Sequence, residues 1–267
     1  FLELKEELKD YPFVSTCDSE VILAAYLKWG IDCISRFNGM FAIALFDRET
    51  EELFLVRDRV GKKPLYYMTA PEGLVFASEL KPIMKFPGFS KDINTKVLTR
   101  YLYQQFIDSP NSIFANVNKL EPGSVLKYKY GKTEVSKYWD VATVYHEKKS
   151  SSDVPKSYEE AKECLKELLL ESTRKRMIAD VPLGSFLSGG YDSSLITAMA
   201  QRIKEEPVKT YSIGFHEDKY NEAKYAKAVS EYLGTCHTEM YIDEKDMFAL
   251  VESIPKYYDE PFADSSQ

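Results

Sequence analysis

The spacing of hydrophobic and polar residues divides the chain into two parts. In the first part, polar turns separate short apolar runs; these runs are "MFAIALFD", "EELFLVRD", "PLYYMTA" and "GLVFAS". Short strands joined by tight turns are typical of an antiparallel sheet. Apolar residues at helical spacing predict helices over 19–35 and about 95–106. A β segment is predicted over 123–139, with Gly131 in its turn, so this part is expected to be α+β.

The second part begins after Trp139 and alternates between helix and strand. It opens with the polar stretch "HEKKSSSDVPKS", which we interpret as a domain linker over 143–156. An S-x-x-E capping box at Ser157 begins a long helix, and further helices are predicted from about Ser193, from about Asn221 and after Asp243. Strands are predicted at "VPLGSFLS", "VKTYSIGF" and "HTEMYI". This order predicts a parallel sheet covered by helices on both faces.

The composition limits the class of protein. The 267 residues carry a formal charge of −7, so no basic excess exists to neutralise nucleic-acid phosphates. No apolar run approaches the length that spans a membrane. The four cysteines form no C-x-x-C pair, which argues against a zinc cluster or a disulfide framework. We therefore expect a cytoplasmic protein of two domains, with neither nucleic acid nor membrane as a partner.

The stretch "LGSFLSGGYDSSLITAMA", residues 183–200, carries the most specific chemical signal. A nucleophilic serine would need the pattern G-x-S-x-G, and Ser188 has Phe186 in place of the first glycine. A phosphate site fits better, because open α/β sheets bind ligands where a strand leads into a helix. Gly189 and Gly190 would let an anion approach their backbone N–H groups, and the helix start adds donors. The alternative is a structural turn with a serine cap.

We predict a nucleotide site in this loop. The hydroxyls of Ser188, Ser193 and Ser194 can donate to phosphate, whereas Asp192 would repel a bare phosphate and so suggests a bridging Mg²⁺. The pattern "SGGYDSS" resembles the pyrophosphate loop of the N-type ATP pyrophosphatases. The resemblance implies that the loop, with Gly189 and Gly190, holds the phosphates of ATP. It also implies that Asp192 serves the metal site. Two residues would flank the adenosine, Leu187 and Ile213.

Further stretches resemble the glutamine-hydrolysing asparagine synthetases along nearly the whole chain. They are "STCDSEVILAAYLKWG", "FNGMFAIALFD", "LFLVRDRVGKKPLYY", "FASELKPI", "KLEPGSVLKY" and "DEPFADSS". The resemblance implies the later part of an antiparallel, Ntn-type class II glutamine amidotransferase domain over 1–142. Over 157–267 it implies the first part of an α/β parallel-sheet ATP pyrophosphatase domain, similar to the adenine nucleotide α-hydrolases. The expected reaction is ATP-dependent amidation of aspartate through β-aspartyl-AMP, with ammonia from glutamine.

Asp18 in "CDSEV" matches the family aspartate that holds the α-amino group of glutamine. Its local interpretation is a helix N-cap, and the two roles are compatible. The family's nucleophile is an N-terminal cysteine, but residue 1 is Phe1 and no cysteine precedes Cys17. We therefore predict no catalytic residue in this chain. We expect a fragment truncated at both ends, which by itself completes neither half-reaction.

Two alternatives remain open on function. The first is a β-lactam synthetase-like amide ligase, in which an internal amine replaces ammonia and the glutaminase domain is degenerate. The second is a nucleotide-binding fragment without enzymatic activity. The expected small-molecule partners are glutamine, aspartate and ATP, with a homodimer as a further option. The stretch "RDRVGKKPLYY" predicts an ion-paired turn around Arg57, Asp58 and Arg59 that leads into a strand.

Overall fold

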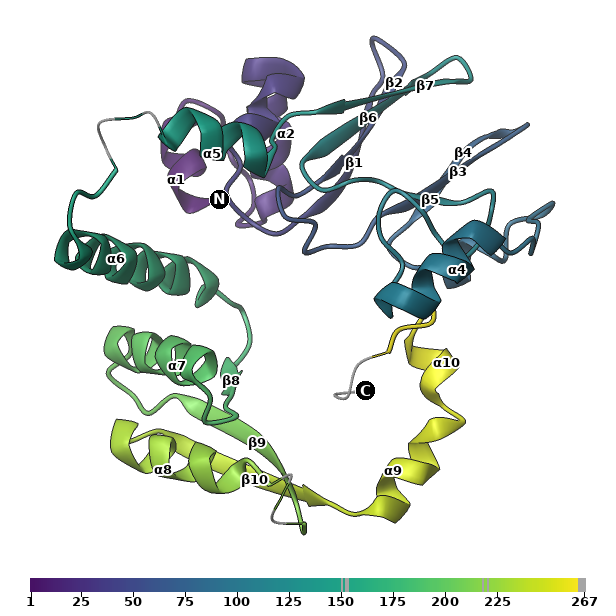
Figure 1. The fold of residues 1–267 in the computed structure, drawn as a ribbon. Helices are drawn as coiled ribbons and strands as arrows, with labels where there is room; N and C mark the ends of the chain where they lie inside the picture. The colour runs from purple at the N-terminus through teal and green to yellow at the C-terminus, as the bar shows by residue number, and fades with distance from the viewer. Residues whose placement is uncertain (150, 152–153, 218, 220, 264–267) are drawn as a thin grey trace. The chain divides into compact units, whose positions relative to one another are not determined.

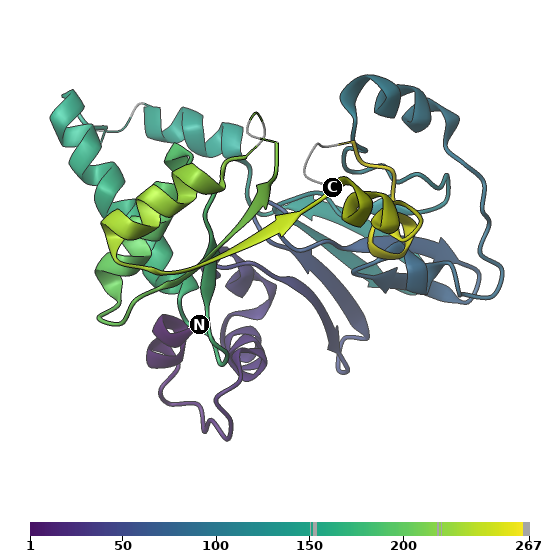
Figure 2. The ribbon, with the colours of Figure 1, turned by 90° about the horizontal axis from the view of Figure 1, so that it is seen from below.

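The computed structural model describes residues 1–149, 151, 154–217, 219 and 221–263. They form two compact units: unit 1 holds the described residues of 1–150 and 255–267, and unit 2 holds those of 151–254 (Figure 1). The chain thus leaves unit 1 for unit 2 and returns to unit 1 at position 255. The returning segment, drawn yellow, lies beside the helix that covers 95–104 in both views (Figures 1 and 2).

Unit 1 contains two antiparallel sheets, with the strand orders β1-β2-β6-β7 and β4-β3-β5. The strands are β1 (Ala42–Asp47), β2 (Glu52–Arg57), β3 (Tyr66–Ala70), β4 (Gly73–Ala77), β5 (Asn118–Lys119), β6 (Ser124–Lys129) and β7 (Lys132–Lys137). The helical segments are α1 (Leu2–Glu7), α2 (Asp18–Trp29), η1 (Gly30–Arg36), α3 (Leu80–Ile83), α4 (Thr95–Gln104) and α5 (Val141–Lys149). The antiparallel α+β arrangement predicted for this half is confirmed.

Each sheet of unit 1 buries apolar side chains against helices. In the first cluster, Val21, Ala24 and Ala25 of α2 pack with residues of β1 and β2 such as Leu45 and Phe54. The second cluster joins β3, α3 and α4; it contains Tyr66, Met68, Leu80, Ile83 and Val97. The helical spacing of the apolar residues in α2 therefore directs one face of that helix onto the sheet.

The turn between β6 and β7 follows from two residues. Tyr130 has φ 48° and Gly131 has φ 77°, so both adopt the left-handed conformation. Positive φ at both central positions matches the turn to the right-handed twist of the strands, and glycine adopts this conformation without a steric penalty. The predicted turn at Gly131 is confirmed.

Unit 2 contains a three-stranded parallel sheet in the order β10-β9-β8. Its strands are β8 (Gly184–Phe186), β9 (Lys209–Phe215) and β10 (Cys236–Ile242), and its helices are α6 (Tyr158–Arg176), α7 (Tyr191–Ile203), α8 (Ala223–Leu233) and α9 (Glu244–Val251). A short helix, α10 (Ile254–Tyr257), lies where the chain returns to unit 1. The predicted parallel sheet is confirmed, and so are the helix starts at Ser157 and Asp243, whose side chains accept hydrogen bonds from the following N–H groups.

The prediction that helices cover both faces of this sheet is wrong for the described part of unit 2. The chain passes from β8 to β9 to β10 in one direction across the sheet, and right-handed crossovers then place α7 and α8 on the same face. The opposite face exposes apolar side chains; these are Phe186, Tyr211, Ile213 and Met240. In addition, α7 begins at Tyr191, two residues before the predicted start.

The predicted linker is partly helical, because α5 occupies 141–149. Residues 150, 152 and 153 of the linker lie outside the described residues, as does the end of "DEPFADSS" at 264–266. None of the helices that the structure describes combines the length and apolar character needed to cross a membrane.

Candidate functional site

The predicted nucleotide loop lies between β8 and α7, at the carboxyl end of the parallel sheet. Four residues, 187–190, connect the last residue of β8 to Tyr191, the first residue of α7. The Leu187 N–H donates to the Tyr211 carbonyl at 2.8 Å, so the pairing with β9 continues one residue beyond β8. Leu187 is 1% exposed and belongs to the core on the helical side. The loop therefore leaves the sheet from a fixed point and enters the helix within one short turn.

Gly189 is the position at which this turn requires glycine. It has φ +81°, which side-chain-bearing residues rarely adopt. A β-carbon at this position would also lie 2.5 Å from the Tyr225 β-carbon and 2.7 Å from the Ala226 nitrogen. The backbone at Gly189 thus lies directly against the start of α8. Gly190 differs, because its φ is −71° and its added β-carbon would meet only Ser188 Oγ, at 3.4 Å.

Ser188 and Ser193 close the loop by hydrogen bonds. Their hydroxyl oxygens are 3.0 Å apart, and the Ser188 N–H donates to Ser193 Oγ at 3.3 Å. Ser193 Oγ also donates to the Gly190 carbonyl at 3.3 Å, and the Gly190 N–H donates to Ser188 Oγ at 3.4 Å. These contacts bring together three of the predicted residues, with Gly189 between them, and they hold the backbone in a compact bend.

The start of α7 offers further donors to an anion. No side chain of the described residues caps this helix, so its first N–H groups keep their hydrogen-bonding capacity and the positive end of the helix dipole. Ser194 Oγ is buried and has no hydrogen-bond partner among the described residues. A buried hydroxyl without a partner costs free energy, which a bound oxygen ligand would recover. Asp192 lies in the first turn of α7 and is exposed.

The two residues predicted to flank the adenosine lie on opposite sides of the sheet. Leu187 is buried on the helical side, whereas Ile213 of β9 is 51% exposed on the open face. The structure therefore brings the glycines and serines of the loop together but does not bring these two side chains into contact. Among the described residues, no cluster of three or more metal-ligating side chains occurs, so Asp192 is the acidic group that could serve a metal in this loop.

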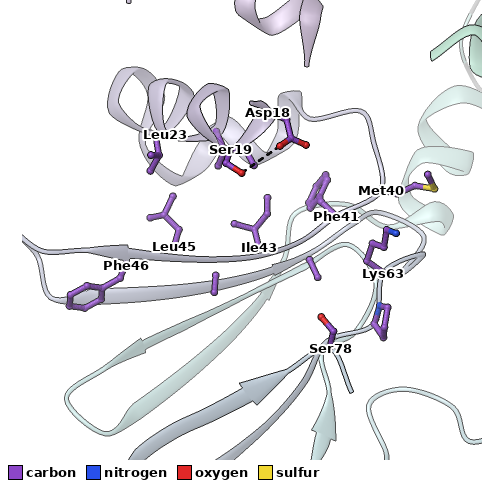
Figure 3. A pocket seen from close by; sticks show the side chains of 14 residues that line it. Asp18, Ser19, Leu23, Met40, Phe41, Ile43, Leu45, Phe46, Lys63 and Ser78 are labelled. Atoms are coloured by element: carbon purple, nitrogen blue, oxygen red, sulfur yellow. Dashed lines mark hydrogen bonds between the residues drawn. The ribbon is translucent and has the colours of Figure 1, made fainter. Parts of the chain in front are cut away.

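Unit 1 contains a cavity of about 800 Å³ between α2 and β1 (Figure 3). Asp18 and Ser19 at the start of α2 line one end of it, and residues of β1 form its floor. Lys63 and Ser78 come from two later segments. No local pattern indicates Lys63 and Ser78, because only the fold brings them to the same cavity as Asp18. The cavity combines one carboxylate, one ammonium group and apolar walls, which suits a small zwitterionic ligand.

The N-cap interpretation of Asp18 is wrong in the structure. Asp18 is the first residue of α2, Cys17 occupies the N-cap position, and the Asp18 carboxylate takes a 3.5 Å hydrogen bond from the Ser19 hydroxyl (Figure 3). Glu20 instead organises the preceding loop, because its carboxylate accepts hydrogen bonds from Val14 and Ser15. These hydrogen bonds lower the pKa of Glu20, and the bond from the Ser15 side chain has the largest effect. The Asp18 carboxylate is thereby left at the cavity.

The turn that carries Lys63 is built on backbone hydrogen bonds rather than on the predicted ion pairs. The Asp58 side chain is fully buried, and it accepts hydrogen bonds from the N–H groups of Lys62 and Lys63, both at 2.9 Å. The Arg57 guanidinium donates to three backbone carbonyls, those of Gly61, Lys63 and Leu120. Burial lowers the pKa of Arg57 from its ordinary value. The hydrogen bonds of Asp58 and Arg57 to the peptide groups of the turn fix the position of Lys63.

Comparison with known protein families identifies the region that contains the Asp18 cavity. A family model described as a glutamine amidotransferase domain matches residues 1–139, which is more than half of the chain. The chain belongs to the glutamine amidotransferase family. A second model, described as asparagine synthase, matches residues 164–267 and so contains the whole serine-glycine loop. The resemblance read from the sequence is confirmed, and the amidotransferase match includes Asp18, Lys63 and Ser78.

Curated relatives of this amidotransferase chain carry both regions. It is 39% identical over 271 residues to a putative glutamine-hydrolysing asparagine synthetase from Methanocaldococcus jannaschii, covering 100% of the chain and 51% of the relative. It is 32% identical to asparagine synthetase 1 of Bacillus subtilis, covering 99% of the chain and 41% of the relative. The solved structure of a glutamine phosphoribosylpyrophosphate amidotransferase from B. subtilis is also similar, with a TM-score of 0.37 and 13% sequence identity. The match covers 97% of this chain and 71% of the amidotransferase chain. The chain spans about half the length of the curated relatives it matches.

Proposed function

We propose that this chain is part of a glutamine-hydrolysing asparagine synthetase. One observation carries the proposal: a loop that requires glycine at Gly189 lies between a parallel strand and a helix start, in a chain that also holds an amidotransferase region. The relatives named asparagine synthetase carry the same two regions. In this proposal, 1–142 is part of an Ntn-type amidotransferase domain. Residues 157–267 are then part of an ATP pyrophosphatase domain.

The proposed synthetase reaction needs an activated carboxylate. An oxygen of the aspartate β-carboxylate attacks the α-phosphorus of ATP, and the bond from that phosphorus to the bridging oxygen breaks, so pyrophosphate leaves. Ammonia then attacks the acyl carbon, loses a proton, and AMP leaves with the electrons of the carbon–oxygen bond. Asparagine results. Activation is necessary because a carboxylate oxygen is a poor leaving group and AMP is a better one.

The residues of unit 2 have distinct roles in this proposal. Backbone N–H groups at Gly189 and Gly190, with the start of α7, bind the departing pyrophosphate as negative charge develops on it. Ser194 Oγ, buried and without a partner in the described structure, donates to a phosphate oxygen. Asp192 would hold Mg²⁺, which neutralises phosphate charge when bound. Leu187 and Ile213 would lie near the adenosine, one on each side of the sheet.

The residues of unit 1 bind glutamine in this proposal. The Asp18 carboxylate accepts hydrogen bonds from the α-ammonium group of glutamine, and the apolar walls of the cavity hold the side chain. Hydrolysis releases ammonia and glutamate. Cys33 is buried, and we assign no nucleophile within the described residues.

The proposal also covers the location of the protein in the cell and its oligomeric state. We propose a cytoplasmic location, because the four cysteines are free thiols and such thiols persist in a reducing compartment. A homodimer stays a prediction, which light scattering on the protein encoded by the complete reading frame would test.

The decisive experiment is pyrophosphate exchange into ATP, measured on the protein encoded by the complete reading frame. We expect exchange that requires both Mg²⁺ and aspartate, together with glutamine-dependent asparagine formation. Exchange that aspartate does not stimulate would contradict the assignment and favour a β-lactam synthetase-like ligase with another acceptor. Nucleotide binding without any exchange would leave only a binding function.

A further inference from the structure

The segment that returns from unit 2 places two neighbouring carboxylates on unit 1. Asp259 accepts a hydrogen bond from the Leu80 N–H at 2.7 Å, and its other oxygen lies 2.6 Å from the Lys81 ammonium. Leu80 is the first residue of α3, so Asp259 binds the helix start through both charge and a backbone donor. Asp259 and Leu80 are separated by 179 positions in the sequence.

Glu260 makes an independent set of contacts. One of its oxygens accepts from the Ile113 N–H at 2.7 Å, and the other forms an ion pair with Lys119 and accepts from the Tyr66 hydroxyl at 3.4 Å. The side chains of Glu260 and Lys119 are 10% and 12% exposed. A buried carboxylate is stable only while its partners remain, so these contacts hold the segment in one position. Burial, followed by the charge of Glu260, raises the pKa of Tyr66.

A third contact extends the attachment along the segment. The Ala263 N–H donates to the Gln105 carbonyl at 2.9 Å, at the end of α4. The segment therefore binds unit 1 at α3, at β3 and β5, and at α4. We call residues 259–263 the return anchor.

The return anchor binds a segment of unit 1 that also contributes to the wall of the Asp18 cavity. Ser78 lines that cavity, and Leu80, which the Asp259 carboxylate binds, follows two residues later. Leu80 is fully buried in the cluster that joins β3, α3 and α4. Because only Glu79 separates Ser78 from Leu80, a change in the hydrogen bond to the Leu80 N–H would reach the backbone at Ser78.

We propose that Asp259 and Glu260 are positioning residues that couple the nucleotide-bearing part of the chain to the glutamine cavity. This inference rests on the proposed function. While the return anchor is bound to unit 1, the cavity wall at Ser78 keeps its position. The chain that comes from unit 2 is then attached to the amidotransferase region at residues 259–263. The two carboxylates do not contact glutamine or ATP in this proposal. They make glutamine hydrolysis respond to the state of the synthetase unit.

The test uses Asp259→Asn, Glu260→Gln and the double variant in the protein encoded by the complete reading frame. We expect asparagine formed per glutamine hydrolysed to fall by about 2- to 30-fold, the range typical of residues that transmit coupling. Asparagine synthesis from added ammonia, which does not use the glutamine cavity, should stay at the wild-type level. The matched control is Glu252→Gln, an exposed carboxylate earlier on the same part of the chain.

Each outcome decides between the alternatives. An unchanged ratio in the double variant would overturn the inference, and so would a parallel fall in ammonia-dependent synthesis, because that indicates a purely structural role. Lys119→Gln should reproduce the effect of Glu260→Gln, and combining them should add little further loss. Hydrogen exchange at the Leu80 and Ile113 amides should accelerate in the variants. A wild-type protein that forms no asparagine would instead contradict the proposed function.

Discussion

Gly189 lies so close to Tyr225 that a β-carbon at position 189 would be 2.5 Å from the Tyr225 β-carbon. Together with φ +81°, this contact means that the loop of unit 2 accepts only glycine at that position. Gly190, one residue later, has an ordinary φ of −71° and open space around it apart from Ser188 Oγ. The two glycines of one motif therefore have different physical requirements.

Gly189→Ala is expected to lower the free energy of unfolding by about 2–4 kcal/mol, because it combines an unfavourable φ with overpacking against α8. Gly190→Ala should change it by less than about 1 kcal/mol. Urea denaturation of both variants, beside the wild type, measures this difference. Equal stabilities for the two variants would contradict the geometry described for the loop. Both variants should weaken ATP binding if the backbone N–H groups face phosphate.

Asp192→Asn is expected to weaken Mg²⁺-ATP binding by about tenfold or more, because a neutral amide replaces the carboxylate that we propose holds the metal. Stability should change by less than about 1 kcal/mol, since Asp192 is exposed and a carboxylate in the first turn of a helix gains only a modest interaction with its dipole. Titration calorimetry with and without Mg²⁺ measures the effect, and Glu205→Gln serves as an exposed acidic control on the same unit. Equal affinity of Asp192→Asn and wild type would remove the metal role from this residue.

Features that depend on neighbouring residues could be predicted from the sequence. Gly131 adopts the left-handed conformation of its turn, and Ser157 and Asp243 accept hydrogen bonds at the helix starts that they were expected to cap. Each of these depends on a side chain and a backbone group a few positions apart, so the local pattern contains the information. The serine-glycine loop was recognisable for the same reason.

Features that depend on distant segments could not be predicted in this way. The contact between Asp259 and Leu80 spans 179 positions, and no local pattern indicates which backbone group a carboxylate will bind. The sequence pattern around Asp58 predicted an ion-paired turn, but the Asp58 side chain is buried and accepts hydrogen bonds from backbone N–H groups instead. The one-sided covering of the parallel sheet depends on the direction in which the strands follow one another, which helix and strand patterns do not encode.

Tyr26→Phe is expected to lower the free energy of unfolding by about 1 kcal/mol. The Tyr26 hydroxyl donates to Asp47 at 2.8 Å and joins α2 to the end of β1, while the ring packs near Phe54. The substitution keeps the ring and removes only the hydrogen bond, so the α2 core should persist. Thermal unfolding beside Tyr225→Phe, an exposed tyrosine in unit 2, measures the loss. A variant as stable as wild type would show that solvent replaces this bond without cost.

Cys33 provides a test by pH. Its side chain is fully buried, and burial, followed by the charge of Asp32, raises the pKa of the thiol to about 11. In the unfolded chain the thiol loses its proton near pH 8.5, so the folded state binds the proton more tightly. Stability must then fall as pH rises through this window, because the unfolded state holds fewer protons.

Between about pH 8 and 9 this effect separates from that of the buried tyrosines, because ordinary tyrosines lose the proton only near 10 and Tyr26 and Tyr138 have pKa values of about 12. We expect a loss of about 0.5–1 kcal/mol over that interval in the wild type, and a smaller slope in Cys33→Ala. Urea denaturation at both pH values provides the slopes. A thiol reagent at pH 8 should modify the exposed Cys17, Cys164 and Cys236 rapidly and Cys33 only on unfolding. Rapid modification of all four thiols, or equal slopes for the two proteins, would show that Cys33 is accessible in solution and that the α2 core opens more readily than its packing implies.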